Sequence, residues 1–177
     1  MRISAWSCLA LLIGTAGSLP PLAAPLDPPQ RRGILATGKP LYSHAREELI
    51  IRDFLHDQRG GFFLDVGCGH PIQDSNTYYL EKHLGWSGIG VDALPEFARK
   101  WRRNRPASKF FNFLVTDHAG TSEPFFRAEL KDISSAEKPT RVLDGRPLKS
   151  EEIRVPTITL TRLLEQNGPT KIDFPHR

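Results

Sequence analysis

An apolar run that ends in two glycines constrains the fold of this chain more than any other feature. The run, Phe62–Val66, is interrupted only by Asp65, as in a short strand buried on both faces of a parallel sheet. Gly67 and Gly69 follow, and glycine lets a backbone turn tightly and approach a ligand closely. A helical pattern then covers residues 75–84. Strand, glycine turn and helix together predict the nucleotide-binding half of a doubly wound α/β fold.

Two later acids follow strand-like runs in the same way. Residues 88–92 form a short apolar run that ends in Asp92, where such a fold places the carboxylate that binds ribose hydroxyls. The alternative for Asp92 is a helix N-cap or a turn acid. A third strand is expected over residues 109–115, and Asp117 follows it. Ligands bind at the carboxyl ends of such strands, so both acids are candidate site residues.

The rest of the chain predicts shorter elements around this unit. Ser43 could cap a helix, and Gly85 is a suitable residue to end the helix over 75–84. A strand is expected to begin at Val155, followed by a helix that Thr157 or Thr159 caps. The other expected elements are helices over 43–58, 95–104 and 160–166, a hairpin strand over 123–127 and a polar surface excursion over 131–154.

Three parts of different composition divide the 177 residues. Residues 1–24 resemble a secretory signal: a positive start, an apolar segment too short to span a bilayer, and small residues. A wrongly chosen start codon is the alternative, so the sequence leaves export and a cytoplasmic location both open. Residues 25–42 are proline-rich and predict a linker. Residues 43–177 are then the folded domain.

Other potential chemistry in the sequence has a plain structural interpretation. The basic residues between Arg99 and Arg105 alternate with aromatic ones, as on a solvated helix face, and we expect no nucleic-acid partner. Cys68 is interpreted as a small residue that fits the turn. His70 and His118 are near the site in sequence but are typical of loop or surface positions. No ligand spacing predicts a metal site.

Several pieces in order resemble the FkbM-type S-adenosylmethionine-dependent methyltransferases. The resemblance covers roughly residues 60–174. It implies a class I methyltransferase fold, S-adenosylmethionine as cofactor, and methyl transfer to a hydroxyl of a sugar or another small molecule. The matching pieces are Phe63-Leu64-Asp65-Val66-Gly67-Cys68-Gly69, residues 84–95, Asn104-Arg105-Pro106, residues 157–164 and Lys171-Ile172-Asp173-Phe174.

The resemblance also implies roles for the candidate site residues. Asp65, Gly67 and Gly69 match the turn that contacts the methionine end of the cofactor, and Asp92 matches the ribose-binding acid. Asp117 lies where such enzymes often contact adenine. The cofactor carries an ammonium group, ribose hydroxyls and an exocyclic amine, and carboxylates can accept hydrogen bonds from all of these donors. No catalytic base can be named from the sequence.

Two other functions remain open. A nicotinamide-binding protein with this fold needs a third glycine three positions after the second, where this chain has Ile72. A non-catalytic remnant or binding module could keep the cofactor turn without activity.

The end of the chain departs from the family pattern. Strand four is expected to start at Lys171-Ile172-Asp173-Phe174, but Pro175 follows at once and is disfavoured in a central strand. We therefore expect an incomplete sheet, with strands one to three and only the start of strand four. On this expectation the strand Phe62–Val66 is left as an exposed edge, and the chain is a truncated member that is inactive alone.

Overall fold

The computed structural model describes residues 38–130, 133–138, 140, 142–143, 145–168 and 171–176. The expected leader over 1–24 and most of the linker over 25–42 lie outside the described residues. The described part is an α/β structure with a four-stranded, all-parallel sheet that alternates with helices, and a smaller mixed sheet.

The parallel sheet has the strand order β3-β2-β1-β9. Phe63 and Leu64 of the inner strand β1, and Ile89 of its neighbour β2, are at most 2% exposed. This burial on both faces confirms the α/β interpretation of the two apolar runs. The strands are β1 (Phe62–Val66), β2 (Ser87–Asp92), β3 (Ser108–Asn112) and β9 (Phe174–His176).

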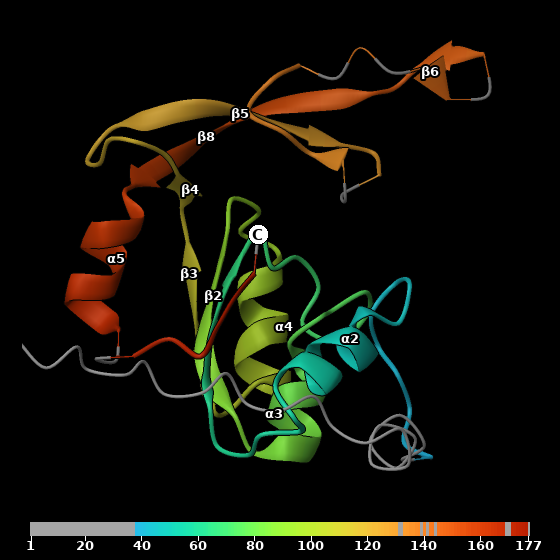
Figure 1. Cartoon of the computed structure of the whole chain (residues 1–177). Helices are drawn as coiled ribbons and strands as arrows, with labels where there is room; N and C mark the ends of the chain where they lie inside the picture. Colours follow the sequence, from blue (N-terminus) through green and yellow to red (C-terminus); the bar gives the residue numbers. More distant parts are fainter. Residues whose placement is uncertain are drawn as a thin grey trace, which may run out of the picture.

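Helices cover both faces of this sheet (Figure 1). Three helices lie on one face, where Phe63 packs against α2 and α3 and Trp101 of α4 belongs to the neighbouring part of the core. The fourth helix, α5, lies on the other face, where its Leu163 packs against Leu64 and Ile89. The helices are α2 (Glu47–Phe54), α3 (Tyr78–Leu84), α4 (Phe97–Asn104) and α5 (Leu160–Asn167).

Two glycines in β2 let large aromatic side chains sit directly on the sheet. A Cβ on Gly88 would lie 2.4 Å from the ring of Phe63, and one on Gly90 would lie 2.6 Å from the ring of Trp101. These glycines therefore serve packing, because any side chain would collide with a buried ring.

A projecting arm of antiparallel strands extends beyond the carboxyl edge of the parallel sheet (Figure 1). In the mixed sheet β8 lies between β4 and β5, parallel to β4 and antiparallel to β5, and β6 and β7 form a separate pair. We call β5 to β8 the arm. The strands are β4 (Leu114–Val115), β5 (Ser122–Ala128), β6 (Val142–Leu143), β7 (Arg146–Pro147) and β8 (Ser150–Ile158).

The expected third strand over residues 109–115 is wrong as a single strand. β3 ends at Asn112, whose side-chain amide donates to the backbone oxygens of Asp92 and Ala93, at 2.9 Å each. The chain leaves the parallel sheet at this point, and Leu114–Val115 pairs with β8 instead.

The start of β8 also differs from the prediction. The strand begins at Ser150 rather than Val155, because its first half pairs with the whole length of β5. Residues 150–154 are mostly polar and exposed, so no apolar pattern marks them as a strand. The hairpin strand expected over 123–127 is confirmed as β5.

The helix predictions are correct in position, with one helix much too long. The helix expected over 43–58 is only α2, because Arg46 before it and His56 and Asp57 after it have positive φ angles of 64°, 51° and 54°. Gly85 ends α3 in the left-handed conformation, with φ 70°. Thr159 caps α5 and accepts the backbone N–H of Arg162 at 3.1 Å.

The expectation that β1 is an exposed edge is wrong over much of the strand. β9 pairs with β1 in parallel, with Phe174 opposite Phe63 and His176 opposite Asp65. Pro175 is tolerated because β9 is itself the edge strand, where a missing backbone N–H need not leave a partner unpaired. The sheet therefore has a fourth strand, although a short one.

Candidate functional site

The turn after β1 is open on the side where a ligand could approach. Gly67 and Gly69 have φ angles of 74° and 53°, and a Cβ on either would meet no atom within 4 Å. The backbone N–H of Gly67 donates to the backbone oxygen of Val91 at 2.8 Å, which fixes the turn beside the end of β2. The turn glycines thus differ from Gly88 and Gly90, because the space beside the turn glycines is not filled by protein.

Asp92 joins the end of β2 to the glycine turn. Its Oδ2 accepts the backbone N–H of Gly69, and its Oδ1 accepts the backbone N–H of Leu94, both at 2.8 Å. Each carboxylate oxygen has a second lone pair, so the group can still accept hydrogen bonds from a ligand. Burial raises the pKa of Asp92, while the two backbone donors act in the opposite direction.

Asp65 lies deeper than Asp92 and is 2% exposed. The hydroxyl of Thr77 donates to its Oδ2 at 2.7 Å, and His176 lies opposite it on β9. Burial raises the pKa of Asp65, and the Thr77 hydrogen bond and the charge of Arg105 oppose this shift. The hydrogen bond from Thr77 therefore fixes the position of the Asp65 carboxyl group beneath the glycine turn, on the side of the protein interior.

A fully buried arginine supports this part of the site. Arg105 pairs with Glu81 through Nε at 2.6 Å and donates from Nη2 to the Thr77 hydroxyl at 3.1 Å. It also donates from Nη1 to the backbone oxygen of Pro71 at 3.1 Å. Trp101 of α4 also contacts the glycine turn, because its indole N–H donates to the backbone oxygen of Gly69 at 2.9 Å.

Sequence reasoning missed this role of Arg105. The residue ends a run of four other cations, Arg99, Lys100, Arg102 and Arg103, and no local pattern separates it from them. Its burial depends on contacts with residues distant in sequence: Glu81 of α3 and the backbone oxygen of Pro71 after the glycine turn.

Asp117 has very different surroundings from Asp65 and Asp92. It follows β4 in the mixed sheet, and its side chain is 96% exposed. Its Oδ1 lies 2.7 Å from Nδ1 of His118, and this hydrogen bond lowers the pKa of Asp117. The same contact raises the pKa of His118, with a smaller contribution from Glu123. The structure thus brings Asp65, Gly67, Gly69 and Asp92 together and places Asp117 on an exposed loop.

Neither His70 nor Cys68 is well suited to act as a base or nucleophile. Nδ1 of His70 accepts the backbone N–H groups of Ile72 and Gln73, at 3.3 and 3.0 Å, and burial lowers its pKa. Cys68 is buried, and burial raises its thiol pKa well above the ordinary value, which disfavours the reactive thiolate.

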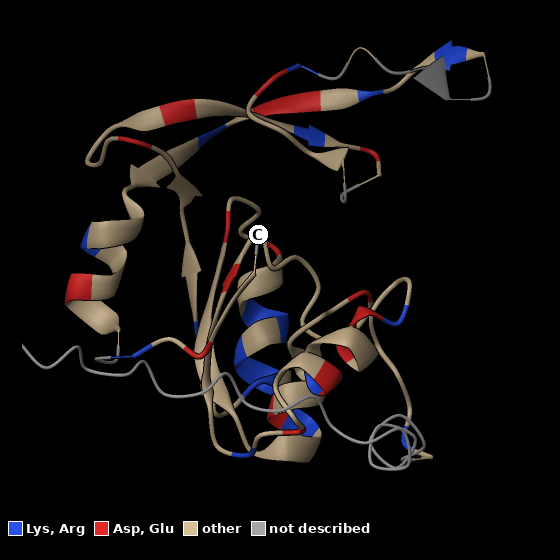
Figure 2. Ribbon diagram, viewed as in Figure 1, with Lys and Arg blue, Asp and Glu red and all other residues tan. Residues whose placement is uncertain are grey.

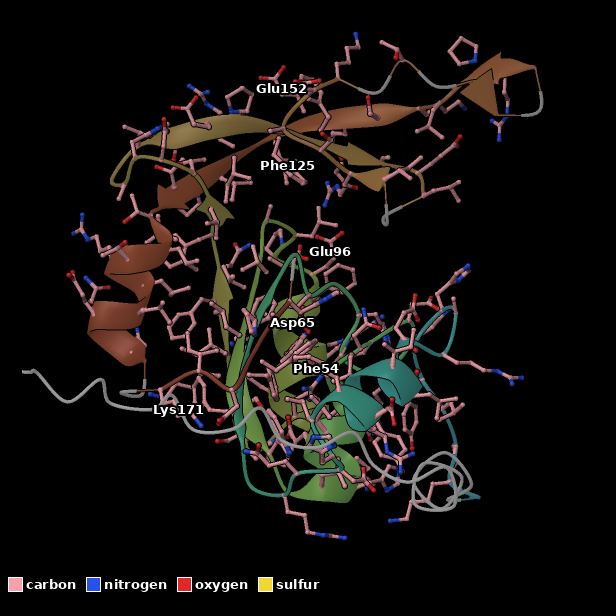
Figure 3. All side chains as sticks on the ribbon, viewed as in Figure 1. Phe54, Asp65, Glu96, Phe125, Glu152 and Lys171 are labelled. Carbon is pink, nitrogen blue, oxygen red and sulfur yellow. The ribbon has the colours of Figure 1, made fainter. Side chains whose placement is uncertain are left out.

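An open surface depression of about 460 Å³ lies between Glu96 and the arm. Glu96, which precedes α4, forms one side and pairs with Arg127 of β5, with 3.6 Å between Oε2 and Nη1. In the projection of Figure 3, Glu96 is labelled above Asp65 and below Phe125 of the arm. The lining residues are Glu96, Arg127, Ala128, Glu129, Lys149, Ser150 and Glu151.

No group of three or more His, Cys, Asp or Glu side chains in the described part of the chain could hold a metal ion. Within the same residues, no helix is both long enough and apolar enough to cross a bilayer.

Comparison of the chain with protein-family models, curated proteins and solved structures found no match.

Proposed function

We propose that this protein binds S-adenosylmethionine at the turn after β1 and belongs to the FkbM-type methyltransferases. One observation carries the proposal: the glycine turn is open and its Gly69 N–H is bonded to the carboxylate at the end of β2. The strand order supports it, because β3-β2-β1-β9 corresponds to the order of nucleotide-binding sheets, in which ligands lie outside the carboxyl ends.

The residues present suit the donor groups of this cofactor. Asp92 retains lone pairs for ribose hydroxyls, and Gly67 and Gly69 leave room for the methionine end. Asp117 would contact adenine from the adjacent loop. The cofactor would supply a methyl group on a positively charged sulfur, which a site with several carboxylates favours electrostatically.

The methyl acceptor would be a sugar or another small molecule with a hydroxyl group. The open depression between Glu96 and the arm has a volume in the range of small-molecule sites, and five of its seven lining residues are charged. Carboxylates there can accept from hydroxyl groups, and Arg127 and Lys149 can donate to them. We name no catalytic base.

Two alternative functions are a nicotinamide-binding protein and a binding module without catalysis. A nicotinamide cofactor is disfavoured by Ile72, which occupies the position of the third glycine. A binding module without catalysis would share every feature of the turn, so only a measurement of turnover separates it from an enzyme.

Calorimetric titration of the purified chain with S-adenosylmethionine and, separately, with NAD tests the proposal. We expect heat with the sulfonium compound only, and binding at least about ten-fold weaker in Asp92→Asn, which loses a charged acceptor. Glu152→Gln, an exposed acid on the arm, is the matched control and should bind like the native chain. Heat with NAD alone would contradict the proposal. Transfer of labelled methyl to a hydroxylated acceptor then distinguishes an enzyme from a binding module.

A further inference from the structure

The exposed side of helices α3 and α4 is strongly cationic. Figure 2 shows basic residues along much of α4. Because the inner sides of these helices pack on the sheet, their exposed side chains point away from it. We call the following exposed residues of α3 and α4 the cationic face: Lys82, Arg99, Lys100, Arg102 and Arg103.

None of the side chains of the cationic face forms an ion pair with a described residue. The buried arginines of the same layer differ, since Arg52 pairs with Asp57 and Arg105 with Glu81. Like charges that are neighbours on a short helix repel one another. The cationic face therefore keeps a positive potential that an external anionic partner can neutralise.

The neighbouring helix α2 carries exposed apolar side chains, on the same short helix as the acids Glu47 and Asp53. Ile50 and Phe54 are 72% and 78% exposed and lie one helical turn apart. α2 is held against α3, since the guanidinium of Arg52 lies 4.6 Å from the centre of the Tyr79 ring. α3 is in turn joined to α4 through Arg105 and Glu81. Apolar and cationic side chains thus occur on one layer.

We propose that this surface docks the protein on an anionic lipid bilayer. Basic side chains attract acidic headgroups, and apolar side chains such as Ile50 and Phe54 can enter the interfacial region. A nucleic-acid duplex would also neutralise the cations, but it offers no apolar environment for these two residues. The combination of charge and exposed apolar surface therefore favours lipid, with the protein lying on the bilayer.

Co-sedimentation of the full chain with lipid vesicles tests this proposal. We expect binding to vesicles that contain phosphatidylserine, stronger at low salt, and much weaker binding to pure phosphatidylcholine. Arg102→Gln with Arg103→Gln should reduce the affinity by about five-fold for each cation removed. The matched control is Arg154→Gln with Arg162→Gln, two exposed cations on β8 and α5. The apolar segment near the N-terminus is common to all variants and cannot cause a difference between them.

A third variant distinguishes the lipid surface from other anions. Phe54→Ser should weaken the binding that remains at high salt, because that part depends on apolar contact. The proposal is overturned if both lipid compositions bind equally, or if the control pair weakens binding as much as the α4 pair. It is also overturned if a DNA duplex binds more tightly than the vesicles and Phe54→Ser changes neither affinity.

Discussion

Acidic residues lie near the ends of strands in two regions of this molecule, and their surroundings are opposite. At the edge of the parallel sheet, Asp65 is 2% exposed and accepts the Thr77 hydroxyl. After β4, Asp117 is 96% exposed and bonds to its neighbour His118. Burial raises the pKa of Asp65, whereas the hydrogen bond from His118 lowers the pKa of Asp117.

The difference lies in what supports each acid. The Thr77 hydroxyl, at the start of α3, donates to Asp65 and accepts from Arg105, at the end of α4. Arg105 also donates to the backbone oxygen of Pro71, in the loop after the glycine turn. Asp117 has a local partner from its own loop. A carboxylate at the end of a strand is thus pre-organised only where other elements pack under it.

Arg105→Ala should produce the largest effect on the supported region. The substitution leaves Glu81 as a buried carboxylate without its cation, and breaking such a pair costs about 3–5 kcal/mol. Chemical denaturation would measure this loss in the free energy of unfolding. Arg103→Ala, an exposed cation on the same helix, is the control and should stay within about 0.5 kcal/mol of the native chain. Equal losses in the two variants would mean that the buried network does not support the site.

The two kinds of glycine should separate stability from binding. Gly88→Ala places a Cβ 2.4 Å from the Phe63 ring, so overpacking should cost about 1–3 kcal/mol. Gly67→Ala meets no atom, and its left-handed backbone should cost only about 1–2 kcal/mol. Its methyl group would, however, occupy the space proposed for the cofactor. We expect cofactor binding to be lost in Gly67→Ala and kept in folded Gly88→Ala. The reverse result in calorimetry would contradict the proposal that the cofactor binds at the turn.

Sequence reasoning recovers the local part of this architecture. The run Phe62–Val66, the turn glycines and the position of Asp92 follow from residue types that are adjacent in the chain. The burial of Arg105 and the pairing of β9 with β1 depend on segments far apart in sequence. β8 was missed in part because its polar first half is a strand only through its pairing with β5.

The pH dependence of stability should differ in sign between the two regions. An acid whose pKa is higher in the folded state favours folding when protonated, so that contribution is lost as the pH rises through the folded pKa. Asp65 is of this kind, and the stability of the native chain relative to Asp65→Asn should fall as the pH rises from acid toward neutral. Asp117 is of the opposite kind: its contribution is fully present above its ordinary pKa and is lost as the pH falls through its lowered folded pKa. Denaturation curves at several pH values would reveal both slopes, and slopes of the same sign would contradict the comparison.

Asp117→Asn should have the smallest effect, and this variant tests whether the exposed acid belongs to the site at all. Its side chain packs against little, so the denaturation midpoint at neutral pH should barely move. If Asp117 contacts adenine, calorimetry should still record weaker binding of S-adenosylmethionine, by a factor smaller than that of Asp92→Asn. Unchanged binding would mean that Asp117 is not part of the proposed site and that, of the three acids, only Asp65 and Asp92 belong to it. A loss larger than that of Asp92→Asn would instead mean that the exposed loop moves onto the ligand, and that support from beneath is not what selects a binding carboxylate here.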